Sequence, residues 1–144
     1  MAFLNSLDIA GSGLTASRLR MDIISENLAN MSTTRTANGS PYRRKTVVYE
    51  SIENQSFQQL LDGSTNETKG GVKVQQIIED QSDFTPVYNP SHPDADADGY
   101  VLMPNVDPIQ ETLDMMSTTR AYDLNLTAIN AIKSMAVKAL EIGR

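Results

Sequence analysis

The 144-residue chain contains no cysteine, no tryptophan and a single histidine, His92. Without cysteine it has no disulfide framework and no thiol nucleophile, and one imidazole does not supply the pair that many metal sites use. His92 lies between Pro90 and Pro93, a context typical of a surface turn. We therefore expect no catalytic residue, no cofactor and no metal site, and the chain is not expected to be an enzyme.

Positive charge is also scarce, since 12 basic residues face 18 acidic ones and the formal net charge is −6. Nucleic-acid-binding proteins gain affinity by neutralising phosphates, so this balance argues against a nucleic-acid partner. The basic residues Arg35, Arg43, Arg44 and Lys45 form one cluster. We interpret that cluster as a solvated or ion-paired loop and not as a polyanion site.

Long apolar runs are absent as well. A membrane-spanning helix needs about 18 to 20 continuous apolar residues. The most apolar segment, residues 124–142, is interrupted by Asn125, Asn130, Lys133 and Lys138. This pattern predicts contact with protein and no membrane span.

What the sequence does contain is a heptad pattern near its beginning. Apolar residues recur there at alternating steps of three and four, interrupted by Ser17, which is typical of a helix that packs along a coiled-coil seam. We predict a helix over about residues 6–31. Its seam consists of Leu7, Ala10, Leu14, Met21, Ile24, Leu28 and Met31.

A second long helix is predicted at the other end, where Asp107 can cap it, Pro108 suits its first position and Gly143 its end. Its apolar residues form two faces, so it needs more than one neighbour: its own N-terminal partner and other chains. The first face consists of Ile109, Leu113, Met116, Thr119, Tyr122, Leu126, Ile129, Ile132, Ala136 and Leu140, and the second of Leu124, Ala128, Ala131, Met135 and Ile142.

The middle of the chain is poor in large apolar residues and predicts only a small β-rich module. β-branched and aromatic residues favour strands at residues 45–50, 72–78, 84–88 and 99–103, with a mobile loop over residues 51–71. The fold class is therefore mainly α with a small β-rich insert, divided into an N-terminal axial helix at 1–34, an outer module at 35–106 and a C-terminal axial helix at 107–144.

The Asp94-Ala95-Asp96-Ala97-Asp98-Gly99 segment matches the first half of a calcium-binding EF-hand loop. The second half does not match, because the twelfth position is Asn105 and Pro104 precedes it. An acidic turn that leads into a strand is the favoured interpretation. The carboxylates Glu111, Asp114 and Asp123 are likewise expected on a solvated helix face, and small residues at 11–13 are expected to allow another helix to approach closely.

Two segments resemble signatures of the bacterial flagellar axial family of rod and hook proteins. Residues 25–34, SENLANMSTT, resemble its N-terminal motif, and residues 119–125, TRAYDLN, resemble its C-terminal Arg-Ala-Tyr motif. The matching positions are Asn27, Ala29, Asn30, Thr33, Thr34, Arg120, Ala121 and Tyr122. Within the family the chain is most similar to the C-type proximal rod branch, on PDADADGYVLMPNV at residues 93–106 and ALEIGR at residues 139–144.

The resemblance implies a structural subunit of the proximal rod of the basal body, with its terminal helices paired as a coiled coil around a hollow shaft that transmits torque. It implies contacts with copies of the chain itself, other rod proteins and a rod-base adaptor. It also implies export by the flagellar type III apparatus to a rod that crosses the periplasm or cell wall. Residues 1–8 lack the basic and apolar regions of a cleaved signal, which agrees with that route.

The predicted assembly interface joins the N-terminal seam to part of the C-terminal helix: Leu113, Met116, Tyr122, Leu126, Ile129, Ala136 and Leu140. The alternative function is a coiled-coil adaptor or scaffold of a secretion-linked assembly. That function needs the heptads alone and neither family motif.

Overall fold

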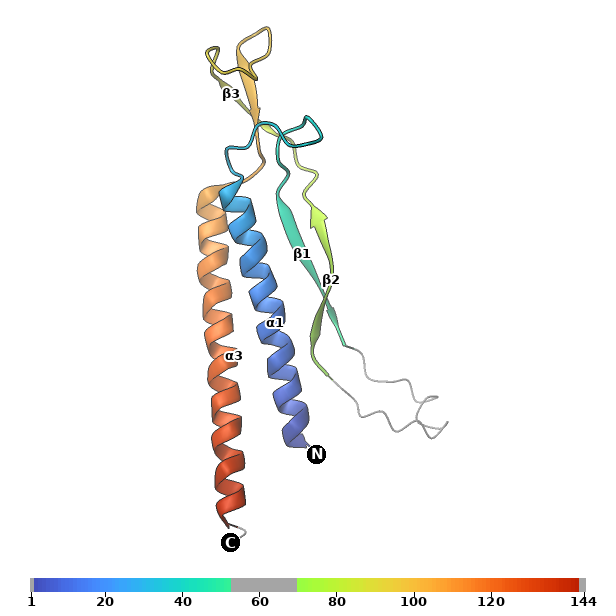
Figure 1. The fold of residues 1–144 in the computed structure, drawn as a ribbon, viewed down its shortest axis with the longest axis vertical. Helices are drawn as coiled ribbons and strands as arrows, with labels where there is room; N and C mark the ends of the chain where they lie inside the picture. Colours follow the sequence, from blue (N-terminus) through green and yellow to red (C-terminus); the bar gives the residue numbers. More distant parts are fainter. Residues whose placement is uncertain (1, 53–69, 143–144) are drawn as a thin grey trace, which may run out of the picture. The chain divides into compact units, whose positions relative to one another are not determined.

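A computed structural model describes residues 2–52 and 70–142 of the chain. Helix α1 (Ala2–Ala29) is followed by strands β1 (Lys45–Ser51), β2 (Val72–Glu79), β3 (Thr85–Tyr88) and β4 (Tyr100–Met103), and helix α3 (Pro108–Ile142) completes the order (Figure 1). The structure confirms the predicted fold class, a mainly helical chain with a small β-rich insert. Each strand lies within one residue of its predicted bounds, while most of the predicted mobile loop lies outside the described residues.

The chain divides into two compact units, each of which takes part of α1, part of α3 and part of the β1–β2 pair. Unit 1 consists of Met1–Leu19, Val48–Gln76 and Thr118–Arg144, and unit 2 of Arg20–Val47 and Ile77–Ser117. Nowhere among the described residues is a helix long and apolar enough to cross a membrane.

Helix α1 begins and ends earlier than its heptad pattern predicted. After Ala29, the N–H of Asn30 still donates to the Glu26 carbonyl at 3.1 Å. The next N–H groups donate over only three residues, from Met31 to the Leu28 carbonyl and from Thr33 to the Asn30 carbonyl. These tight turns end the helix before Met31, so the last predicted seam residue lies outside it.

Helix α3 begins where its capping residues predicted. Asp107 Oδ1 accepts hydrogen bonds from the backbone N–H of Ile109 (2.9 Å) and of Gln110 (3.5 Å). Pro108 occupies the first helical position, where a missing N–H costs nothing. The predicted end at Gly143 lies outside the described residues.

In unit 1, small residues of α1 bring the neighbouring elements close. A Cβ added at Gly13 would lie 3.0 Å from Asn125 Nδ2 on α3, so a larger residue there would push the helices apart. The Ser12 hydroxyl donates to the Ile9 carbonyl (2.7 Å) and accepts from the Val72 N–H (3.1 Å), which fixes the start of β2. The close approach expected for residues 11–13 is confirmed at Gly13.

Unit 2 holds most of the buried side chains. Ile23 and Ile24 of α1, Val101 of β4 and Tyr42 are buried, and so are the polar residues Asn27 and Glu111. Strands β3 and β4 pair antiparallel from Thr85↔Met103 to Tyr88↔Tyr100. Because alternate residues of a strand face opposite sides, Val101 turns inward while its neighbours Tyr100 and Leu102 are exposed.

The turn before β4 yields a first prediction. Gly99 and Gly39 have nearly the same backbone, with φ of 80° and 78°. A Cβ at Gly99 would lie 3.0 Å from Tyr88 Cε2, whereas a Cβ at Gly39 would meet nothing within 4 Å. We expect Gly39→Ala to lower the free energy of unfolding by about 1–2 kcal/mol through its φ alone, and Gly99→Ala by more. Urea unfolding followed by tyrosine circular dichroism measures the difference, and equal losses would show that the crowding at Gly99 relaxes freely.

Candidate functional site

The centre of unit 2 is the side-chain amide of Asn27, which is 1% exposed. Its Nδ2 donates to the Lys45 carbonyl (2.9 Å) and to Glu111 Oε2 (3.0 Å). Its Oδ1 accepts from the Tyr42 hydroxyl (2.9 Å) and from the Lys45 N–H (2.9 Å). The amide thus makes all four hydrogen bonds that it can form. One side chain of α1 thereby fixes the start of β1 and the first turns of α3.

Glu111 on α3 is the charged part of the same cluster, and its side chain is 0% exposed. Arg44 Nε donates to Glu111 Oε1 at 2.5 Å, and the other end of the guanidinium reaches Asp114 Oδ2 at 3.5 Å. Asp114 also pairs with Arg20 of α1 at 3.6 Å. A buried carboxylate without a nearby cation lowers the stability of the fold by several kcal/mol. The guanidinium of Arg44 is therefore needed to balance the charge of the buried Glu111.

These contacts correct one prediction and confirm another. Glu111 was expected on a solvated face, but it is fully buried, because Asn27 and Arg44 supply donors to both of its oxygens. The basic residues were expected in a solvated or ion-paired loop, and ion pairing is confirmed. Lys45 Nζ pairs with Glu26 Oε1 at 2.5 Å, and Arg43 stacks 4.5 Å from the centre of the Phe84 ring.

The N-terminal motif residues after Asn27 shape the chain as it leaves α1. The Thr33 hydroxyl donates to Asn30 Oδ1 (3.1 Å), and the Thr33 carbonyl accepts from the Tyr42 N–H (3.1 Å). The Thr34 hydroxyl donates to Asp94 Oδ2 (2.8 Å). The motif therefore ends the helix and carries the chain back to the Asn27 amide.

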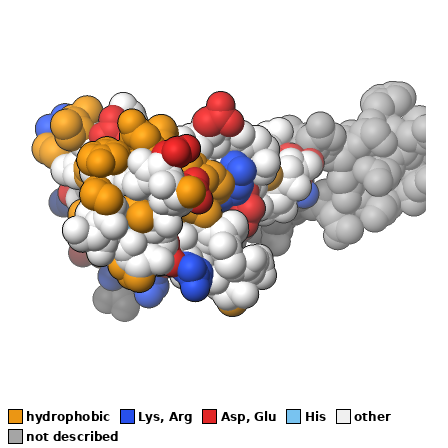
Figure 2. Space-filling view, turned by 90° about the horizontal axis from the view of Figure 1, so that it is seen from above, with side chains coloured by type: hydrophobic (Ala, Val, Ile, Leu, Met, Phe, Trp, Pro, Cys, Tyr) orange, Lys and Arg blue, Asp and Glu red, His pale blue; other side chains and the backbone are white. Residues whose placement is uncertain are grey.

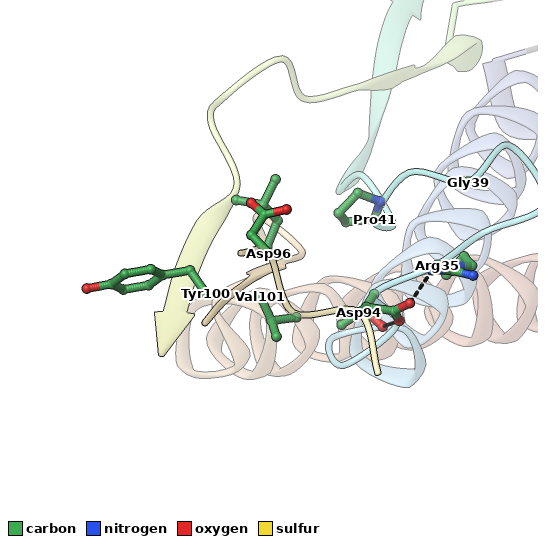
Figure 3. A pocket seen from close by; sticks show the side chains of 9 residues that line it. Arg35, Gly39, Pro41, Asp94, Asp96, Tyr100 and Val101 are labelled. Atoms are coloured by element: carbon green, nitrogen blue, oxygen red, sulfur yellow. Dashed lines mark hydrogen bonds and ion pairs between the residues drawn. The ribbon is translucent and has the colours of Figure 1, made fainter. Parts of the chain in front are cut away.

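A small cavity of about 150 Å³ lies beside Thr34, lined also by Arg35, Asp94, Asp96 and Val101. Arg35 and Asp94 point toward one another and form an ion pair, while the Tyr100 ring points away (Figure 3). Both oxygens of Asp94 are thus occupied within the chain, by Thr34 and by Arg35. Among the described residues, no group of three or more His, Cys, Asp or Glu is placed to hold a metal ion.

The other motif residues lie apart from this cluster. Ala29 is exposed at the end of α1, and Arg120 and Ala121 are exposed on α3, whereas Tyr122 is half-buried. The second motif therefore places an arginine at the surface of its helix and turns the adjacent tyrosine inward.

The predicted assembly residues divide between the inside and the surface of the chain. Those that are buried or half-buried are Leu7, Ala10, Leu14, Met21, Ile24, Leu28, Tyr122, Ile129 and Ala136. Those that are exposed are Met31, Leu113, Met116, Leu126 and Leu140. The first face predicted for α3 is therefore not one inward stripe, because its inward positions include the polar residues Glu111, Thr118 and Asn125.

Helix α3 instead leaves two rows of large apolar side chains uncovered. The first row, called the outer stripe below, contains Ile109, Leu113 and Met116 at steps of four and three, followed by Leu124 and Met135 at wider steps. The second row contains Leu126, Val137 and Leu140. Figure 2 shows apolar side chains reaching the surface in several places on the face drawn there, with charged groups between them.

Comparison with known proteins identifies what this arrangement belongs to. The family described as flagella basal body rod protein matches residues 7–35, and the family described as flagellar basal body rod FlgEFG protein C-terminal matches residues 97–142. The flagellar basal-body rod protein FlgC of Bacillus subtilis (strain 168) is 52% identical over 152 residues, which cover 100% of both chains. This chain belongs to the FlgC family.

Other FlgC relatives are similar over the same length. The flagellar basal-body rod protein FlgC of Borreliella burgdorferi is 42% identical and covers 99% of this chain and 98% of that protein. The FlgC of Salmonella typhimurium is 42% identical over 100% of both chains. The FlgC family consists of structural rod proteins and not of enzymes, so the chain is a structural subunit of the flagellar basal-body rod.

Sequence reasoning missed the partners in the polar cluster. Asn27 was singled out by its motif alone, and Tyr42 and Arg44 had no assigned role in it. The signal that was available is the pair Arg44 and Glu111, two charges next to predicted strand and helix starts. Their 67-residue separation in sequence gave no reason to join them.

The Asn27 cluster yields a second prediction. We expect Asn27→Asp to lower the free energy of unfolding by about 3–5 kcal/mol, because it removes two donors and places a second carboxylate beside Glu111. The exposed Asn38 provides the matched control, and Asn38→Asp should change stability by less than about 0.5 kcal/mol. Urea unfolding of purified protein measures both, and similar small losses would show that the cluster is dispensable.

The third prediction concerns pH. Burial, with the charges of Glu26, Glu111 and Glu79, raises the pKa of Tyr42 from 10.0 to about 12. Between these values the folded chain binds more protons than the unfolded chain, so the free energy of unfolding falls as pH rises from about 10 to about 12. Below that window this tyrosine adds no pH dependence. The Tyr42→Phe variant should have a lower free energy of unfolding, and this free energy should change less with pH between about 10 and about 12. If the free energies of unfolding of the two proteins ran parallel across this range, the raised pKa would not belong to Tyr42.

Proposed function

We propose that the chain forms part of the proximal rod by packing the uncovered faces of α3 against neighbouring subunits, and that the rod so formed is a hollow shaft that transmits torque. The observation that carries this proposal is the exposure of large apolar side chains on α3. Leu124 and Leu140 are 72% and 77% exposed. Water contact at such side chains is unfavourable by about 25 cal/mol for each Å².

The size and placement of the uncovered faces support packing against protein. A long row of apolar residues on one helix face is typical of an interaction surface, whereas single exposed leucines are ordinary. The acidic residues of α3 within unit 2, Glu111 and Asp114, pair with Arg44, so they do not interrupt the outer stripe. Neighbouring subunits that cover the stripe would gain stability from burial that the single chain lacks.

The same contact can build a shaft. When one surface of a subunit packs against a different surface of the next copy and the rotation does not close, the copies form a helical array. We propose that the terminal helices, residues 1–34 and 107–144, form the axial part of this array. Residues 35–106 then form its outer module.

The partners follow from the same proposal. They are copies of the chain, other rod proteins, a rod-base adaptor and the flagellar type III export apparatus, which delivers the chain to a rod crossing the periplasm or cell wall. We propose export without cleavage of a signal peptide.

The fourth prediction tests the exposed face. Leu124→Asp should stop rod assembly and swimming, because burying an unpaired carboxylate costs several kcal/mol at each interface. The matched variant Leu124→Met keeps an apolar side chain of similar volume and should swim normally. Immunoblots of purified basal bodies measure incorporation, with whole-cell blots as the expression control. Normal incorporation of Leu124→Asp would place this face outside any packed interface.

A further inference from the structure

Arg120 interrupts the outer stripe with a charge. It lies one turn after Met116 and one turn before Leu124, and its side chain is exposed. In the described part of the chain, the guanidinium takes part in no hydrogen bond and no ion pair. Among the described residues it is therefore an unpaired cation, and it lies between two exposed apolar side chains.

Covering the outer stripe would remove water from this cation. A guanidinium that loses its water without gaining acceptors costs several kcal/mol, and a carboxylate is the acceptor that fits its fork geometry. The surface that covers Arg120 must therefore bring a carboxylate with it.

Each exposed carboxylate at α3 has a cation within reach in sequence or a capping role. Asp123 lies three residues beyond Arg120 on the same helix, yet the two do not pair in the structure. Glu141 follows Lys138 by three residues, so a cation is within reach of it. Asp107 accepts the hydrogen bonds that cap the helix.

Helix α1 exposes two carboxylates, Asp8 and Asp22, and they differ in their surroundings. Asp22 has Arg18 one turn before it, so an oppositely charged group is within reach on the same helix. Asp8 has no charged residue within four positions on either side. One turn beyond Asp8, a Cβ at Gly11 would meet nothing within 4 Å, which leaves room for another helix to approach.

We propose that Arg120 of one copy forms an ion pair with Asp8 of a neighbouring copy, so that the outer stripe of α3 packs over the first turns of α1 in the next subunit. The two surfaces are complementary in charge and in shape. The cation and large apolar side chains of α3 would face the carboxylate of Asp8 and the open space at Gly11 on α1. The two faces differ, so the contact is head-to-tail and can repeat along an array. The inference rests on the proposed assembly through α3 and names the surface that covers it.

A charge exchange in the full chain, expressed in motile cells, tests the pair. Arg120→Glu and Asp8→Arg, each alone, should lower incorporation into basal bodies by about tenfold or more, since like charges then face each other. The double variant Arg120→Glu/Asp8→Arg should recover most of the loss. The control Arg120→Glu/Asp22→Arg restores the same net charge at the wrong carboxylate and should not recover. Rescue by that control, or no rescue by the Asp8 exchange, would overturn the assignment.

Crosslinking gives a second measurement that does not depend on rescue. The chain has no cysteine, so Asp8→Cys/Arg120→Cys introduces the two thiols alone. A short bismaleimide should join neighbouring subunits of isolated basal bodies into multimers that contain this chain. The control Asp22→Cys/Arg120→Cys should give far fewer. Absence of multimers from the Asp8 pair in rods that have assembled would contradict the contact.

The two proposals fail separately. If Leu124→Asp blocks incorporation while Arg120→Glu does not, the α3 face is an interface and the ion pair is wrong. If both variants incorporate normally, the outer stripe is not an interface and both proposals fall.

Discussion

The packing of unit 2 depends on the four hydrogen bonds of one buried amide. Asn27 connects a helix, a strand and a second helix that are brought together from positions 18 and 84 residues away. Apolar packing alone would let the helices rotate or slide against each other, because apolar side chains can pack in many arrangements of similar energy. An amide whose two donors and two acceptors are all satisfied has one low-energy arrangement, and misplacing it leaves buried polar groups unpaired.

Polar groups are buried beside apolar ones in this chain, and many large apolar side chains are exposed. The interior of unit 2 contains an amide, a carboxylate and a tyrosine hydroxyl, while many leucine, isoleucine and methionine side chains of α3 remain exposed. Such a chain gains geometric specificity from its interior and leaves much of its hydrophobic free energy to be gained from neighbours. This division suits a subunit whose final environment is a rod of many copies.

The local elements could be read from the sequence because their causes are local. Asp107 and Pro108 marked the start of α3 through the needs of the first helical N–H groups, and β-branched residues such as Val47 and Val48 marked β1. The early end of α1 was not predictable in this way. The heptad pattern continues to Met31, but the hydrogen bonds of Thr33 with Asn30 and Tyr42 bend the chain before it.

The sequence by itself determined the two helices, the strands and the family, through heptads, capping residues and two short motifs. Only the tertiary structure decided which face of α3 turns inward. Periodicity ranks the faces of a helix by their apolar residues, and α3 has more than one apolar face, whereas its inward face includes the polar residues Glu111, Thr118 and Asn125. The partners of Glu111, which are Asn27 and Arg44, are distant from it in sequence. A polar residue can be predicted as buried only when its hydrogen-bond partners are known.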